Sequence, residues 1–157
     1  MKIRVLSIGK TNIDFVEQGL QEYLKRLKHY TKLEWIELPD VKQVDRSNTS
    51  ELKTRESERF LEQLKPTDHL ILLDEKGKHR SSEEMANWIK DHQLYQQSDL
   101  VFIIGGAYGF SETLYTKANG KLSLSKMTFN HQMVRMIFAE QLYRAFTIIK
   151  GEPYHHA

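Results

Sequence analysis

The sequence predicts an α/β domain, with a mostly parallel β-sheet and helices on both of its faces. Short apolar segments alternate along the chain with longer segments in which apolar residues recur at helical spacing, and this alternation is typical of β-α units. Two of the short segments, residues 69–74 and 100–104, are almost continuously apolar, as in strands covered on both faces. The 157 residues contain no internal repeat or linker, so we expect a single domain over 1–157.

The first half of the chain is expected to contain two strand-helix pairs. Residues 3–8 are predicted to form a strand and residues 12–30 a helix, because the apolar residues of the latter follow the helical period. A second strand is expected at 33–38. It is followed by a polar loop over 41–50 and by a charged helix over 51–64.

The second half continues the alternation. After the strand at 69–74 we expect Gly77 to turn the chain, and Ser81 and Glu84 have the spacing of a capping box that starts a helix. The remaining predicted elements are a strand at 100–104, a short helix at 111–118, a short strand at 122–124 and a helix at 130–150. The last helix is apolar around more than half its circumference. Such a helix is either central in the core or, as we expect in so small a domain, shared with a second subunit of a homodimer.

The composition excludes several classes of protein. The 39% of hydrophobic and 28% of charged residues are ordinary for a soluble protein, and no segment approaches the roughly 18 consecutive apolar residues of a membrane span. The apolar start is too short for a signal peptide. The absence of cysteine excludes disulfides and thiolate zinc sites and fits a cytoplasmic protein. The seven histidines show no metal-ligand spacing, so we expect no metal.

A ligand is expected beyond the carboxyl ends of the strands, where open parallel sheets bind small molecules. Three such ends carry suitable residues, at 73–74, 104–106 and 124–126. The run Gly-Gly-Ala-Tyr-Gly at 105–109 does not match the dinucleotide motif, and no Gly-Lys-Ser/Thr of a phosphate loop follows it. On these residues alone, the alternative that the glycines only form a tight turn stays open.

Five segments together resemble a known family. They are the start 1–10, the glycine turn 104–109, the Leu-Ser-Leu-Ser-Lys-Met-Thr-Phe-Asn-His-Gln run at 122–132, the Arg135–Ala145 helix and the Pro-Tyr-His end at 153–155. Their order and spacing are similar to those of the small SPOUT-class methyltransferases, and more closely to the bacterial enzymes that methylate N3 of a pseudouridine in large-subunit ribosomal RNA.

The resemblance implies a deep trefoil knot near the C-terminus, a rare exception to normal topology. It also implies a bent S-adenosylmethionine in the knotted loops, and a homodimer in which both subunits build each active site. Ribosomal RNA, in the large subunit or the assembled ribosome, would be the substrate. Carried over by position, the cofactor site would comprise Leu73, Gly105, Leu124, Ser125, Lys126, Met127, Thr128 and Phe129.

Methyl transfer to an imide nitrogen requires positioning and the loss of a proton. The candidates are Tyr154 as positioning group, His155 as proton acceptor or relay, and Arg135 or Arg144 for contact with an oxygen or a phosphate. For Arg135 the alternative is a structural ion pair with Glu140 or another neighbour. For the tail the alternative is fraying at the chain end.

RNA contact would run mainly through phosphates, and the candidate contacts are Lys10, Lys25, Arg26 and Lys28. Two other functions stay open at this point. One is a non-catalytic RNA- or ribosome-binding module that keeps the fold, and the other is a nucleotide-binding domain of flavodoxin type.

Overall fold

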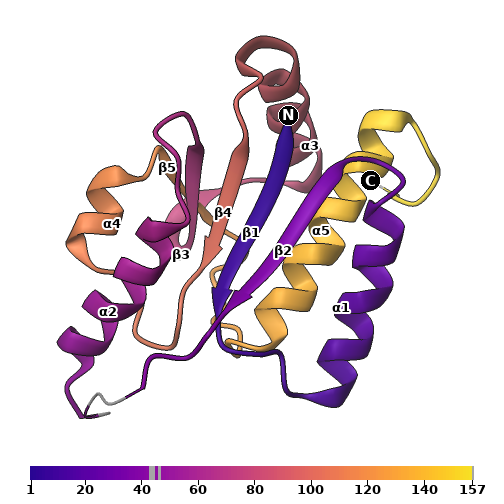
Figure 1. Cartoon of the computed structure of the whole chain (residues 1–157). Coiled ribbons are helices and arrows are strands. Elements are labelled where there is room, and N and C mark those ends of the chain that lie inside the picture. The colour runs from indigo at the N-terminus through magenta and orange to yellow at the C-terminus, as the bar shows by residue number, and fades with distance from the viewer. Residues whose placement is uncertain (43–44, 46, 157) are drawn as a thin grey trace.

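Five strands form one sheet in the order β2-β1-β4-β3-β5, and every neighbouring pair is parallel (Figure 1). This computed structural model describes residues 1–42, 45 and 47–156. The strands are β1 (Lys2–Ile8), β2 (Lys32–Leu38), β3 (His69–His79), β4 (Leu100–Ile104) and β5 (Gly120–Ser123). All five predicted strands are therefore present, although their bounds differ by several residues.

Helices cover both faces of the sheet (Figure 1). They are α1 (Asp14–Leu27), α2 (Thr49–Glu62), α3 (Ser82–Asp91), α4 (Glu112–Lys117) and α5 (Met133–Lys150). Side chains alternate along the strands, so Val5 and Phe102 pack toward α1, α3 and α5 while Leu6 and Ile103 pack toward α2 and α4. The predicted fold class is confirmed.

The strand β3 departs from the prediction at its second half. Gly77 was expected to turn the chain after a strand that ends at residue 74, whereas the structure places it within β3, which continues to His79. Its pairing with β5 shifts register between Leu73 and Lys78, which are both opposite Leu122. A Cβ atom on Gly77 would lie 2.7 Å from the backbone nitrogen of Leu122. The glycine therefore permits a close backbone approach within an irregular strand.

Helix ends also differ from the prediction, and one element was not predicted. The capping box of Ser81 and Glu84 is confirmed, with both of its hydrogen bonds present. After α3 the chain continues as a π-helical segment, η1 (His92–Gln96), which ends at Gln97 with a φ of 58°. The helix α5 begins at Met133, because the side chain of Asn130 accepts hydrogen bonds from the backbone N–H groups of Gln132 and Met133. The polar loop expected over 41–50 includes 43, 44 and 46, which lie outside the described residues.

The last helix occupies the middle of one helical layer, between α1 and α3. Several of its apolar residues nevertheless stay only half-buried, namely Met133, Val134, Met136, Ile137, Tyr143, Ile148 and Ile149. The tail beyond α5 lies at the amino-terminal ends of the strands, on the same side of the molecule as the N-terminus (Figure 1). None of the helices in the described ranges combines the length and the apolar character needed to cross a membrane.

Candidate functional site

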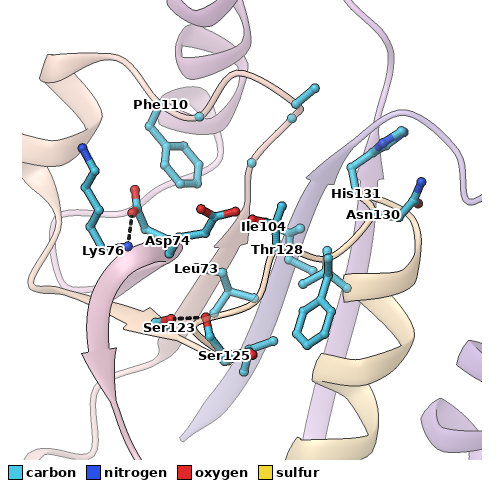
Figure 2. A pocket seen from close by; sticks show the side chains of 18 of the residues that line it. Leu73, Asp74, Lys76, Ile104, Phe110, Ser123, Ser125, Thr128, Asn130 and His131 are labelled. Atoms are coloured by element: carbon cyan, nitrogen blue, oxygen red, sulfur yellow. Dashed lines mark hydrogen bonds between the residues drawn. The ribbon is translucent and has the colours of Figure 1, made fainter.

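A cavity of about 610 Å³ lies at the carboxyl ends of β4 and β5, beside the point where the register of β3 shifts (Figure 2). Three chain segments line it: residues 73–76 within β3, residues 104–110 from the last residue of β4 onward, and a run from the end of β5 to the first turn of α5. The volume falls within the range of small-molecule sites. The position is the one expected for a ligand of an open parallel sheet.

The glycine turn forms one wall and brings bare backbone to the cavity. A Cβ atom on Gly105 would lie 2.9 Å from Cζ of Phe110, and one on Gly106 would lie 3.0 Å from Oε1 of Glu56. Gly109 has a φ of +83°, which favours glycine, and its N–H donates to the carbonyl of Gly106 over 3.3 Å. Packing therefore favours glycine at 105 and 106, and the turn favours it at 109.

Asp74 gives this edge of the cavity a fixed negative charge. Its Oδ1 accepts a hydrogen bond from the Lys76 N–H at 2.8 Å, and its Oδ2 accepts one from the Tyr115 hydroxyl. Burial, and then the bond to Asp74, raise the pKa of Tyr115 to about 12. Glu75 adds a second carboxylate to the lining.

The loop after β5 is shaped by its own side chains (Figure 2). The Ser123 hydroxyl donates to the carbonyl of Ser125 over 2.9 Å, and Oγ of Ser125 accepts from the Met127 N–H over 2.9 Å. The Asn130 cap then leads the chain into α5. This loop therefore holds its backbone against the cavity without support from regular secondary structure.

Most of the residues carried over for the cofactor do meet at this cavity. Those in its lining are Leu73, Gly105, Leu124, Ser125, Met127, Thr128 and Phe129. Lys126 differs, because its side chain is exposed and it does not line the cavity. Lining residues that the sequence did not assign to the cofactor site include Asp74, Phe110, Asn130 and His131. Asp74 belongs to the strand end 73–74 that was expected to face a ligand, but it was not named as a contact.

Arg135 lies outside the cavity lining, in a buried network of its own. Only 3% of the residue is exposed. Its guanidinium donates to the carbonyls of Ile8 and Gly9, each over 2.8 Å, and to Thr11 Oγ1 and Glu37 Oε2, each over 3.0 Å. Burial lowers the pKa of Arg135, and the charge of Glu37 opposes this effect. Arg135 therefore forms a structural ion pair, which was the alternative to a role in contact with RNA. Its partner is Glu37 rather than Glu140.

The other three predicted catalytic residues form one cluster. Arg144 lies over the Tyr154 ring, 4.7 Å from its centroid, and its Nη1 is 3.1 Å from Nδ1 of His155. Tyr154 and Arg144 both donate to Oε1 of Glu140. Burial first, and then hydrogen bonds with Tyr23 and Glu140, raise the pKa of Tyr154. The described part of the tail is thus bonded to α5, in contrast to the alternative of a frayed end.

The cluster and the cavity occupy different ends of the molecule. The cavity opens beyond the carboxyl ends of the strands, whereas the tail lies near their amino ends (Figure 1). Both are connected through α5, which contributes Val134 to the cavity and Arg144 to the cluster. Within the described ranges, no three histidine or acidic side chains gather closely enough to hold a metal ion.

A parallel sheet with a backbone-lined cavity at its carboxyl edge defines an α/β protein that binds a small organic molecule. The chain belongs to the SPOUT methyltransferase family, since the family model described as "Predicted SPOUT methyltransferase" matches residues 1–155. It is 48% identical over 156 residues to the ribosomal RNA large subunit methyltransferase H of Cytophaga hutchinsonii, covering 99% of this chain and 100% of that protein. It is 49% identical over 156 residues to the protein of the same name from Flavobacterium johnsoniae, covering 99% of each.

One solved structure with a similar fold is the putative methyltransferase Lpg2936 from Legionella pneumophila, in complex with bound SAM. The two chains are 12% identical with a TM-score of 0.46, over 95% of this chain and 66% of that one, which is too distant to support an argument. The resemblance seen in the sequence and the predicted methyltransferase class are confirmed by the family match and the close relatives. The trefoil knot remains an implication of family membership.

The raised pKa of Tyr115 predicts a loss of stability at alkaline pH. The unfolded chain releases the tyrosine proton near its ordinary pKa of 10.0, whereas the pKa in the folded chain is about 12. The free energy of unfolding therefore falls as pH rises through this window, and the contribution is fully present below it. In Tyr115→Phe we expect the free energy of unfolding to fall less steeply with pH than in the wild type. Urea unfolding at several pH values from 8 upward measures this. An unchanged pH dependence in this variant would contradict the assignment.

Proposed function

We propose that the protein transfers a methyl group from S-adenosylmethionine to N3 of a pseudouridine in large-subunit ribosomal RNA. The observation that carries this proposal is the backbone-lined cavity at the carboxyl edge of β3, β4 and β5, in a chain that matches its relatives over their full length. The relatives' printed name supplies the ribosomal RNA of the large subunit. The pseudouridine N3 position comes from the resemblance described above.

The cavity has the chemistry that this cofactor needs. Adenine is flat and its polar edge suits backbone groups, which the loop 124–129 presents at the cavity wall. The glycines at 105 and 106 let the backbone of this wall pass close to the side chains of Phe110 and Glu56, where a Cβ atom would clash. The carboxylates of Asp74 and Glu75 in the lining favour a positive sulfonium, because opposite charges attract. The cofactor supplies a methyl group that needs no further activation, so the cavity residues serve to hold and orient it.

The acceptor nitrogen must lose its proton, and the cluster of Tyr154, His155 and Arg144 offers groups for this task. Tyr154 would position the base, His155 would accept or relay the proton, and Arg144 would contact an oxygen or a phosphate. Since this cluster and the cavity lie at different ends of one chain, we infer that the tail of one protomer reaches the cavity of its partner. The half-buried apolar residues of α5 support such a homodimer.

The remaining candidates take supporting roles. We assign Arg135 a structural role, because its buried guanidinium joins the end of β1 to the start of α5. Lys10, Lys25 and Lys28 are exposed and stay candidate phosphate contacts, whereas Arg26 is engaged with Glu22 at 3.0 Å. The protein would act in the cytoplasm, where ribosomal RNA is assembled with ribosomal proteins.

The function is tested by mass spectrometry of ribosomal RNA from cells that lack this protein. We expect one methyl group to be missing from a pseudouridine of the large-subunit RNA. The wild-type gene should restore it, and a Tyr154→Ala gene should not. A fully methylated RNA in the deletion strain would instead favour a non-catalytic RNA- or ribosome-binding module.

Cofactor binding is tested with two substitutions in one loop. Thr128 and Lys126 are both exposed, but only Thr128 lines the cavity. By calorimetry, Thr128→Trp should weaken S-adenosylmethionine binding at least about tenfold, or about 1.4 kcal/mol, because the indole fills the cavity mouth. Lys126→Trp is the matched control and should bind as the wild type does. Equal affinities for the two variants would place the cofactor elsewhere, and Gly105→Val, which would crowd the Phe110 ring, provides a second check.

A further inference from the structure

The imidazole of His155 is held at both of its nitrogens. Nδ1 lies 3.1 Å from Nη1 of Arg144 on α5, and Nε2 lies 2.7 Å from Oε1 of Glu83 on α3. The His155 side chain is 17% exposed, so these two contacts define most of its polar surroundings. Glu83 lies in the first turn of α3, next to the capping box, and 72 residues separate it from His155 along the chain.

The two partners together determine where the imidazole proton lies. A guanidinium group can only donate hydrogen bonds, so Nδ1 of His155 must accept from Arg144 and carries no proton. The remaining proton of the neutral ring is then on Nε2, which donates to the Glu83 carboxylate. The bond to His155 is also the main reason why the pKa of Glu83 lies below its ordinary value. The Nε2–H tautomer is thus the one that satisfies every partner.

The same contacts extend to the other residues of the cluster. Glu140 accepts from Nε of Arg144 over 3.1 Å and from the Tyr154 hydroxyl over 3.0 Å, so one carboxylate fixes both groups. The charged and titratable groups around His155 are therefore Glu83 from α3, Glu140 and Arg144 from α5, and Tyr154 from the tail itself. Glu83 is the one member of this set that α3 contributes, and it ties the tail to that helix.

We propose that Glu83 is a positioning residue for methyl transfer. By accepting from Nε2–H it fixes the tautomer of His155 and keeps the Nδ1 lone pair toward Arg144, so that Nδ1 is the nitrogen that takes up a proton, and it does so when the Arg144 N–H gives up its bond to the ring. The proposal rests on the proposed function, because that function gives His155 of the tail a part in methyl transfer. Glu83 itself does not contact the acceptor base, and it acts through His155.

The tautomer can be measured directly by ¹⁵N NMR of the imidazole nitrogens in the protein without cofactor or RNA. We expect the wild type to show an unprotonated Nδ1 and a protonated Nε2 for His155. Glu83→Ala should give a mixture of both tautomers, because the acceptor is lost. Glu83→Gln should retain the wild-type pattern, since its amide oxygen still accepts from Nε2–H. A wild-type ring protonated at Nδ1, or an unchanged pattern in Glu83→Ala, would overturn the proposal.

Kinetics of the same variants separate positioning from structure. Glu83→Ala should lower kcat at least about tenfold while the KM for S-adenosylmethionine stays the same, and Glu83→Gln should recover a large part of kcat. Asp91→Asn is the control, because it removes a carboxylate from the exposed far end of α3 and should leave kcat unchanged. An equal kcat in Glu83→Ala and wild type would contradict the role. A wild type without methyl transfer would refute the proposed function instead, while the NMR result would still stand.

Discussion

The parallel pairing of β3, β4 and β5 is the constraint on which the site depends. Leu73 is opposite Ile104 on one side and Leu122 on the other, so β4 and β5 end close to the level at which the register of β3 shifts. Three chain segments therefore meet within one small region, and together they enclose the cavity. In one wall, glycines leave the backbone without side chains. In another wall, hydrogen bonds of serine and asparagine side chains fix the conformation of the backbone. The ligand site is thus made mainly of backbone.

Helix α5 connects this backbone site to the ionic cluster of the tail. Its first turns are anchored by Arg135 to the carbonyl groups that end β1, and farther along it carries Glu140 and Arg144. Because α5 keeps the cavity and the tail cluster of one chain apart, the two could work together only if a second chain completes the site. In the proposed dimer, the partly covered apolar residues of α5 and the bonded tail would serve one arrangement, in which each protomer lends its tail to the other.

Local patterns in the sequence predicted the strands, the alternation with helices and the edge at which the cavity lies. What the sequence could not predict depends on contacts between distant segments. Gly77 looks like a turn, but its position within β3 depends on the close approach of the Leu122 backbone. Arg135 and Arg144 were both candidates on one helix, and the burial of Arg135 against the carbonyl groups of Ile8 and Gly9 joins segments that are distant in the sequence. The bond of Glu83 to the tail joins residues that no local rule connects.

The central claim is that the cavity of one protomer works with the tail of its partner. It is tested most directly by mixing a Thr128→Trp variant with a variant that lacks residues 154–157, at a cofactor concentration at which neither is active by itself. A shared site leaves one intact cavity with one intact tail in every mixed dimer, so an equal mixture should regain about a quarter of wild-type methyl transfer after subunit exchange. If each site lay within one chain, the mixture would stay inactive, and that result would contradict the account.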